Sequence, residues 1–154
     1  MDGAIEAIYI APKGGAEIQP VDEVHAIANC GLKGDRYCTR IDDVTDKDGS
    51  QVTLISYEDL KQIEEARGVQ VTQGEHRRNL VMRGVYLGDL TGKRFEVGGS
   101  VLEYMKPCPP CSYIESITEP GMAKALVGCG GICARVIESG VIRVGDPVRL
   151  ATLD

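Results

Sequence analysis

The sequence has no tryptophan and only one phenylalanine, Phe95, among its 154 residues. A core without large aromatic rings has to be filled by aliphatic side chains, and the hydrophobic fraction of 43% is sufficient for that. No apolar run approaches the roughly 18 residues that a membrane-spanning helix needs. No change in composition along the chain suggests a second unit. We therefore expect one soluble domain over residues 1–154, with no membrane partner.

An export signal and an excess of positive charge are also missing. The first residues, Met1-Asp2-Gly3-Ala4, show neither the basic start nor the apolar stretch of a signal peptide. The formal net charge is −6, whereas binding to nucleic acid requires cations clustered over a whole face. We therefore expect a cytoplasmic protein without a nucleic-acid partner, in which positive charge is confined to local clusters.

Cysteine is well represented, with six residues at positions 30, 38, 108, 111, 129 and 133. Without an export signal, this pattern favours thiols or metal ligands over a disulfide framework. Cys108 and Cys111 lie in the stretch Lys-Pro-Cys-Pro-Pro-Cys-Ser at 106–112, whose prolines exclude a helix interior or a central strand. We expect a stiff, exposed corner in which Lys106 favours the reactive thiolate form of a nearby cysteine.

Short apolar segments separated by glycines predict a mainly β fold with a minor helical part. Ser56 followed by Asp59 is a helix start signal and Gly68 a stop signal, which predicts a helix over residues 57–67 with Tyr57, Leu60, Ile63 and Ala66 on its apolar face. A second helical segment is expected near 122–127. Strands are predicted at 4–10, 21–27, 52–55, 80–82, 94–97 and 101–105, with two or three more in 132–150. The expected architecture is a β-barrel with one or two short helices.

The stretch Gly-Leu-Lys-Gly-Asp-Arg-Tyr at residues 31–37 brings Lys33, Asp35 and Arg36 together in a glycine-rich bend. One interpretation is a simple turn that carries a surface ion pair. The other is a loop whose backbone amides and cations hold an anion.

A second cationic cluster, His76-Arg77-Arg78-Asn79, runs directly into the predicted strand at 80–82. Arginine forks and an asparagine amide suit a phosphate or the polar edge of a heterocycle. The alternative is a charged strand end that faces only solvent.

The last four cysteines permit two further hypotheses. The spacing Cys108-x2-Cys111-x17-Cys129-x3-Cys133 is close to that of a structural zinc site in an interaction module. Against it, strand alternation places Cys133 on the face opposite Ile132, Ala134 and Val136, whereas paired zinc ligands usually lie on a turn. A disulfide oxidoreductase would need a helix to begin at the Cys-x-x-Cys pair, and no such context is visible.

Taken in order, the stretch at 31–37, Arg78-Asn79-Leu80, the Cys108/Cys111 corner, residues 130–136 and the closing 140–146 resemble the MOSC domain, the molybdenum-cofactor sulfurase C-terminal domain. The resemblance covers nearly the whole chain and fits the small, stand-alone bacterial members. It implies a β-barrel fold that binds the molybdenum cofactor, a pterin dithiolene with a terminal phosphate.

In that family a cysteine carries sulfur as a persulfide or coordinates molybdenum directly. The resemblance assigns this role to Cys111, with Cys108 as a resolving thiol or a neighbour. Lys33, Asp35, Arg36, Arg77, Arg78 and Asn79 are the implied cofactor-binding residues. Larger members carry a pyridoxal-phosphate domain that releases sulfur, so a cysteine desulfurase or a molybdoenzyme is the implied partner. A third hypothesis is a molybdenum-dependent reductase of N-hydroxylated compounds supplied with electrons by a partner.

Overall fold

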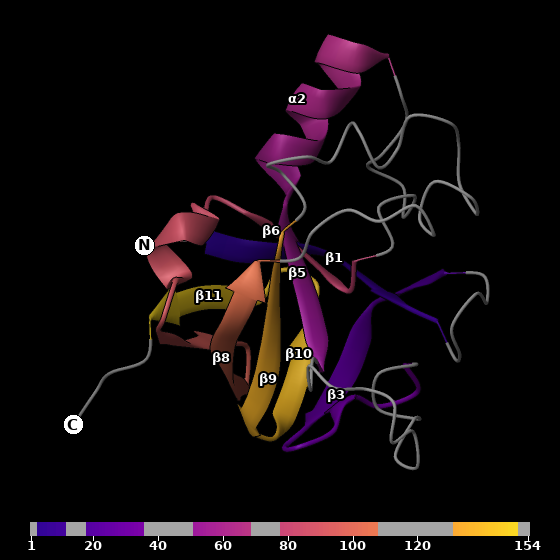
Figure 1. Ribbon diagram of the computed structural model, residues 1–154. Coiled ribbons are helices and arrows are strands. Elements are labelled where there is room, and N and C mark those ends of the chain that lie inside the picture. The colour runs from indigo at the N-terminus through magenta and orange to yellow at the C-terminus, as the bar shows by residue number, and fades with distance from the viewer. Residues whose placement is uncertain (1–2, 12–17, 36–50, 69–77, 108–130, 151–154) are drawn as a thin grey trace, which may run out of the picture.

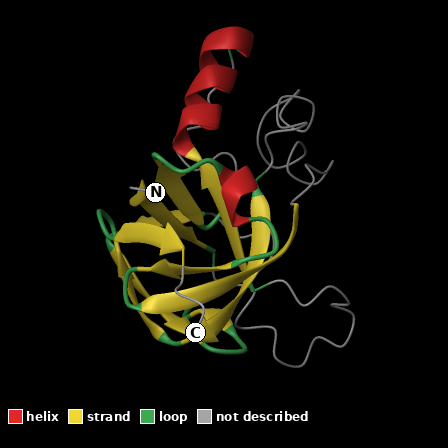
Figure 2. Cartoon of the chain, turned by 90° about the vertical axis from the view of Figure 1, so that its left-hand side faces the viewer, coloured by secondary structure: helices red, strands yellow, loops and turns green. Residues whose placement is uncertain are grey.

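Strands form most of the computed structural model, which describes residues 3–11, 18–35, 51–68, 78–107 and 131–150 (Figure 1). Figure 2 shows the strands curving around a common interior, with the α-helix projecting from one end. The strands are β1 (Gly3–Ile10), β2 (Gln19–Val21), β3 (Glu23–Ile27), β4 (Gly31–Leu32), β5 (Val52–Ser56), β6 (Leu80–Arg83), β7 (Arg94–Val97), β8 (Ser100–Pro107), β9 (Ile132–Glu138), β10 (Gly140–Arg143) and β11 (Pro147–Leu150). The helices are α2 (Tyr57–Arg67) and the short 3-10 helix η1 (Leu87–Leu90).

Seven of these strands close into a barrel in the order β11-β7-β8-β9-β5-β6-β1. Pairing of Gly3 with Val148 joins β1 to β11 and completes the ring. Only β5 and β6 pair in parallel among the described barrel strands, and α2 lies in the connection between them. The mainly β, barrel-centred fold predicted from the sequence is thus confirmed.

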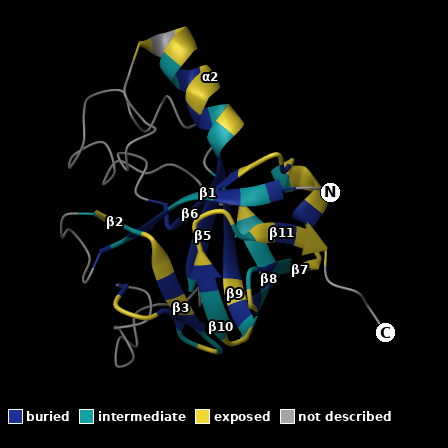
Figure 3. Cartoon of the chain, turned by 180° about the vertical axis from the view of Figure 1, so that it is seen from behind, coloured by how far each residue is buried: buried dark blue, intermediate teal, exposed yellow. Residues whose placement is uncertain are grey.

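The barrel interior is filled by aliphatic side chains from alternate strand positions, together with Phe95. Figure 3 shows these buried positions along the strands. In β9, Ile132, Ala134 and Val136 belong to this core and Cys133 does not, in agreement with the predicted alternation. A second cluster lies outside the barrel, where α2 covers β1, β5 and β6. Because β5 is covered on both faces, all five of its residues are buried.

Helix α2 begins and ends where the sequence predicts. The Ser56 hydroxyl accepts a hydrogen bond from the amide of Asp59 at 3.3 Å. Gly68 ends the helix with a positive φ of 69°, and its amide donates to the carbonyl of Glu64. Leu60 and Ile63 pack against the barrel, but Ala66 is exposed, so the predicted apolar face extends too far.

Two other predictions need correction. Residues 21–27 do not form one strand, because β2 ends at Val21 and β3 starts at Glu23 in a different sheet. Cys30 and Cys133 are both disulfide-bonded, whereas thiols or metal ligands were expected. Strand periodicity does not show which sulfur atoms meet after folding, and that proximity decides whether a disulfide forms. The segment near 122–127 lies outside the described residues.

Candidate functional site

The end of β1 connects two of the segments that the sequence singled out. The carboxylate of Asp35, from the stretch at 31–37, accepts a hydrogen bond from the amide of Ala11 at 2.9 Å. The side-chain amide of Asn79 donates to the carbonyl of Tyr9 at 3.1 Å. Two segments more than forty positions apart in the sequence are therefore fixed to the same three-residue stretch of backbone.

Asn79 is fully buried and joins three strands. Its Oδ1 accepts from the backbone amide of Thr53 at 3.0 Å and from the Thr53 hydroxyl at 3.2 Å. Its own backbone amide donates back to the Thr53 hydroxyl at 2.9 Å. These bonds hold β5, β6 and β1 in register. Contact between Asn79 and a cofactor stays a prediction. The structure shows that Asn79 connects these three strands by hydrogen bonds.

Asp35 is also fully buried, in a bend that requires glycine. Gly31 has a φ of +129° and Gly34 a φ of +87°, and a Cβ at Gly31 would come within 2.5 Å of the Gln51 carbonyl oxygen. The neighbouring Lys33 is exposed. The buried carboxylate and the glycines thus fix the backbone, and this leaves the lysine side chain in solvent.

Arg78 precedes Asn79 and is only 6% exposed. A buried guanidinium is rare in proteins, because the desolvation of a charge is costly unless other groups compensate it. The bonds of Asn79 to β5 and β1 determine where the Arg78 backbone lies. Arg36 and Arg77, which are also implied cofactor-binding residues, lie outside the described residues.

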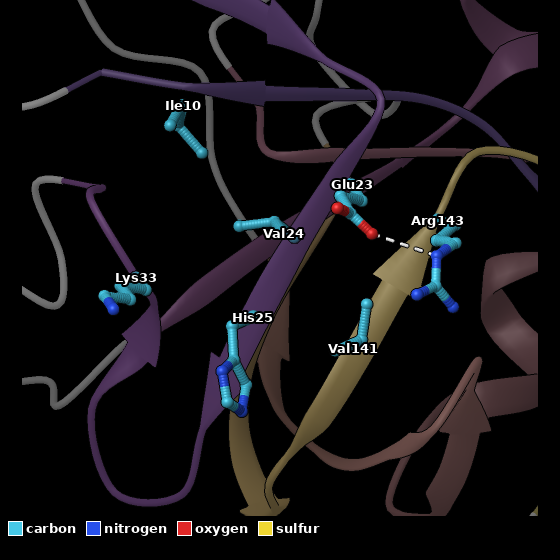
Figure 4. Close-up of a pocket in the computed structure, with 7 residues that line it drawn as sticks. All are labelled: Ile10, Glu23, Val24, His25, Lys33, Val141 and Arg143. Atoms are coloured by element: carbon cyan, nitrogen blue, oxygen red, sulfur yellow. Dashed lines mark hydrogen bonds and ion pairs between the residues drawn. The ribbon is translucent and has the colours of Figure 1, made fainter.

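Lys33 lines an open groove with a volume of about 370 Å³ on the smaller sheet β10-β3-β4. Figure 4 shows Lys33 on one side of β3 and Arg143 on the other. The residues that line the groove are Ile10, Glu23, Val24, His25, Lys33, Val141 and Arg143. The groove combines cationic side chains with an aliphatic surface.

His25 and Arg143 were not identified as candidates from the sequence. The burial pattern of β3 alternates, which leaves Glu23 and His25 exposed on one face. Pairing of β3 with β10 sets His25 opposite Val141 and Glu23 opposite Arg143. Alternation in the sequence indicates the exposed face, but nothing in it shows that these two distant strands are neighbours.

Cys108 and Cys111 lie outside the described residues, so the roles that the resemblance implies for them stay predictions. The chain enters that segment from β8, where Lys106 pairs with Cys133 and Pro107 with Ile132. Cys133 is disulfide-bonded, and a sulfur in a disulfide is not the thiolate that zinc requires. The four-cysteine zinc hypothesis therefore loses one of its ligands. Within the described ranges no group of three or more His, Cys, Asp or Glu residues is arranged for a metal ion.

Comparison with known proteins identifies the family to which this barrel belongs. The model of the MOSC domain matches residues 42–149, which is more than half of the chain. The chain belongs to the MOSC domain family. This family is associated with molybdenum-cofactor-related proteins. The resemblance inferred from the sequence motifs is thereby confirmed.

Solved structures share the MOSC fold of this chain. The YuaD protein from Bacillus subtilis is 19% identical with a TM-score of 0.78, and the match covers 100% of this chain and 98% of that one. YiiM from Geobacillus stearothermophilus is 20% identical with a TM-score of 0.73, over 97% of this chain and 75% of that one. YiiM from Escherichia coli is 18% identical with a TM-score of 0.69, over 100% and 71%.

No curated protein matches the chain. Among the helices in the described parts of the chain, none has the length and apolar character to cross a membrane.

Proposed function

We propose that this MOSC domain binds the molybdenum cofactor and handles sulfur or molybdenum through Cys111. The observation that supports the proposal is the attachment of the 31–35 and 78–79 segments to the end of β1. In an acidic chain of net charge −6, Lys33 and Arg78 are close sequence neighbours of these two anchored residues, which supports a local concentration of positive charge there. A cofactor with a dianionic phosphate needs such localised cations.

The donor set on this side of the barrel fits the organic part of the cofactor. Lys33 offers an exposed ammonium group, and Arg78 brings a guanidinium into a low-dielectric position where electrostatic interactions are stronger. Asp35 and Asn79 keep these two residues in place through the backbone. When bound, the cofactor supplies molybdenum and dithiolene sulfur, which a protein side chain cannot provide.

Cys111 supplies the reactive sulfur in this proposal. As a thiolate it attacks the outer sulfur of a persulfide donor. The bond between the two donor sulfurs breaks, the donor leaves as a thiolate, and Cys111 becomes the persulfide. Lys106, five positions earlier in the chain, favours the thiolate form. A cysteine desulfurase is the matching donor and a molybdoenzyme the matching acceptor.

The proposal is tested by expressing the chain in a host that makes the cofactor and measuring molybdenum and pterin in the purified protein. We expect both to co-elute with the wild type in gel filtration, and a Cys111→Ser variant to lose persulfide formation or bound molybdenum because serine lacks the soft sulfur. Cys108→Ser is the matched control and should have the smaller effect. Wild-type protein that contains neither molybdenum nor pterin would contradict cofactor binding, and a reversed order of the two variants would move the role to Cys108.

Lys33→Gln removes one cation without altering the fold, because its side chain is exposed. We expect it to lower the cofactor retained after gel filtration while the alkylation rate of the thiols stays at the wild-type value. Lys93→Gln, an exposed lysine in the turn before β7, is the control. Equal retention in both variants would show that Lys33 takes no part.

A further inference from the structure

One row of side chains runs across β8, β9 and β5 to the start of β6, strands that lie side by side in Figure 1. Lys106 pairs with Cys133, and Cys133 pairs with Thr53. Thr53 in turn is bonded to Asn79, whose Oδ1 accepts from the Thr53 amide at 3.0 Å. Neither Cys133 nor Thr53 belongs to the barrel core, whereas the residues before and after each of them do. Cys133 and Asn79 therefore lie on either side of Thr53, outside the barrel interior.

Cys133 has the surroundings of a sulfur that leaves readily in thiol–disulfide exchange. It is disulfide-bonded, and it stands directly opposite Lys106 on the neighbouring strand. The Cβ atoms of residues paired in this way are about 4.5–5.5 Å apart, which brings the lysine side chain within reach of the sulfur. A nearby cation stabilises a thiolate, and a stabilised thiolate is the better leaving group.

Burial decides which sulfur of the bond is attacked. Cys133 is only 6% exposed, so an incoming thiolate has little access to its sulfur. Exchange requires approach to one sulfur of a disulfide and departure of the other. The geometry therefore favours attack on the sulfur that is bonded to Cys133, with Cys133 itself as the leaving group.

We propose that Cys133 is the leaving sulfur of a redox switch beside the candidate site. The thiolate of a small thiol attacks the sulfur bonded to Cys133 and forms a mixed disulfide with it, while Cys133 departs as a thiolate opposite Lys106. A second molecule of the thiol then resolves the mixed disulfide. The protein gains two thiols in place of one disulfide, and the two small thiols are oxidised to their own disulfide.

The switch reaches the candidate site through Thr53. One side of Thr53 pairs with Cys133, and the other is bonded to Asn79, which fixes the backbone of Arg78. Reduction removes a covalent constraint from β9 at this row, and the bonds between Thr53 and Asn79 adjust to it. Control of cofactor binding by the switch rests on the proposed function, whereas the exchange chemistry does not.

Exchange is tested on the folded wild-type protein with reduced glutathione as the small thiol. The reaction is stopped with acid, free thiols are labelled with N-ethylmaleimide in denaturant, and the peptides are analysed by mass spectrometry. We expect the maleimide on Cys133 and glutathione on the cysteine that was bonded to it. Glutathione on Cys133, or a bond that resists the thiol until the protein unfolds, would overturn the proposal.

Lys106→Gln tests the stabilisation of the leaving thiolate. It should slow the release of Cys133 about two- to fivefold, because the departing sulfur loses its neighbouring cation. The difference should shrink at high ionic strength, since Lys106 is only partly buried and salt screens its charge. Lys93→Gln, an exposed lysine outside this row, is the matched control and should keep the wild-type rate. Equal rates in the two variants would contradict the role of Lys106.

Chemical shifts of backbone amides test the connection to the candidate site. Reduction of the wild type should shift the amides of Thr53 and Asn79 and leave those of β11 unchanged. Cys133→Ser lacks the bond, so its Thr53 and Asn79 amides should not respond to the reductant. Unchanged amides in the wild type, or the same response in Cys133→Ser, would overturn the coupling between Cys133 and the site.

Cofactor content separates this inference from the proposed function. If Cys133 is released as expected but no pterin is retained in a host that makes the cofactor, the switch stands and the proposed function fails. If pterin is retained equally by oxidised wild type, reduced wild type and Cys133→Ser, the proposed function stands and control of cofactor binding by the switch is overturned.

Discussion

Asn79 shows how one polar side chain can determine the position of a charged neighbour. It is buried without charge, and it bonds the backbone amide of Thr53 and the backbone carbonyl of Tyr9. Removing an amide of this kind leaves a buried donor and a buried acceptor unpaired, each at a cost of about 1–3 kcal/mol. The network therefore contributes to stability as well as to the placement of Arg78.

We expect Asn79→Ala to lower the free energy of unfolding by about 2–4 kcal/mol, because the amide of Thr53 and the carbonyl of Tyr9 both lose a partner. Urea unfolding followed by circular dichroism measures the change. Gln62→Ala, at an exposed position of α2, is the control and should change stability by less than about 0.5 kcal/mol. A loss in Asn79→Ala no larger than that of the control would mean that the network contributes nothing.

Glu103 lies between two arginines on the barrel surface. Hydrogen bonds from Arg94 and then Arg135 lower the pKa of the Glu103 carboxyl, and burial acts in the opposite direction with a smaller effect. A group whose pKa is lower in the folded state stabilises the protein above its unfolded pKa, and this contribution disappears as the pH falls through the folded value.

We therefore expect Glu103→Gln to reduce stability at pH 7 by less than about 1 kcal/mol, as is typical for exposed pairs. The difference from wild type should hold above the ordinary glutamate pKa of about 4.3 and shrink below it. Urea midpoints measured between acidic and neutral pH check this. A difference that stays constant down to strongly acidic pH would exclude the ionic cause.

At the scale of elements, α2 is a short helix that depends on its ends and on one apolar face. Eleven residues are marginal for an isolated helix in water, so the contacts of Leu60 and Ile63 with the barrel have to stabilise it. The Ser56 cap satisfies one of the amides that no helical carbonyl can reach.

Ser56→Ala should cost about 1 kcal/mol, because the amide of Asp59 loses its acceptor. Ser56→Thr keeps a hydroxyl at the same place and should retain most of that stability. Thermal unfolding of both variants gives the comparison. If the two variants lost stability equally, the effect would come from packing at this buried position instead of from the hydrogen bond.

At the scale of the whole molecule, closure of the barrel by β1 and β11 produces one interior that a small number of large side chains must fill. Phe95 is the only phenylalanine in the chain and is fully buried in that interior. Among the described residues, Phe95 is the only aromatic side chain buried in this interior, and Tyr104 packs against it from a partly buried position.

Phe95→Ala should destabilise the fold by about 3–5 kcal/mol, through the lost transfer of the ring from water and the cavity that remains. Phe95→Leu keeps most of the volume and should cost less than half as much. Unfolding in guanidinium chloride, with the same slope for each variant, measures both. Similar losses for alanine and leucine would show that ring shape, and not cavity volume, determines the cost.

Local patterns in the sequence determined the elements of this protein. The Ser56 and Gly68 signals mark α2 because capping and a left-handed helix end depend only on neighbouring residues. Alternation in 132–150 predicted two or three strands, and the structure has three, β9, β10 and β11. The order of several motifs along the chain was sufficient to identify the MOSC domain family.

Only the tertiary structure decided which elements meet. It attached Asp35 and Asn79 to the same end of β1, and it paired β3 with β10 so that Glu23 faces Arg143. It also brought the sulfurs of Cys30 and Cys133 into disulfides, whereas the sequence predicted thiols or metal ligands. Contacts between residues far apart in the sequence arise from the closure of the barrel around a shared core, and no local pattern of hydrophobicity, charge or glycine encodes that closure.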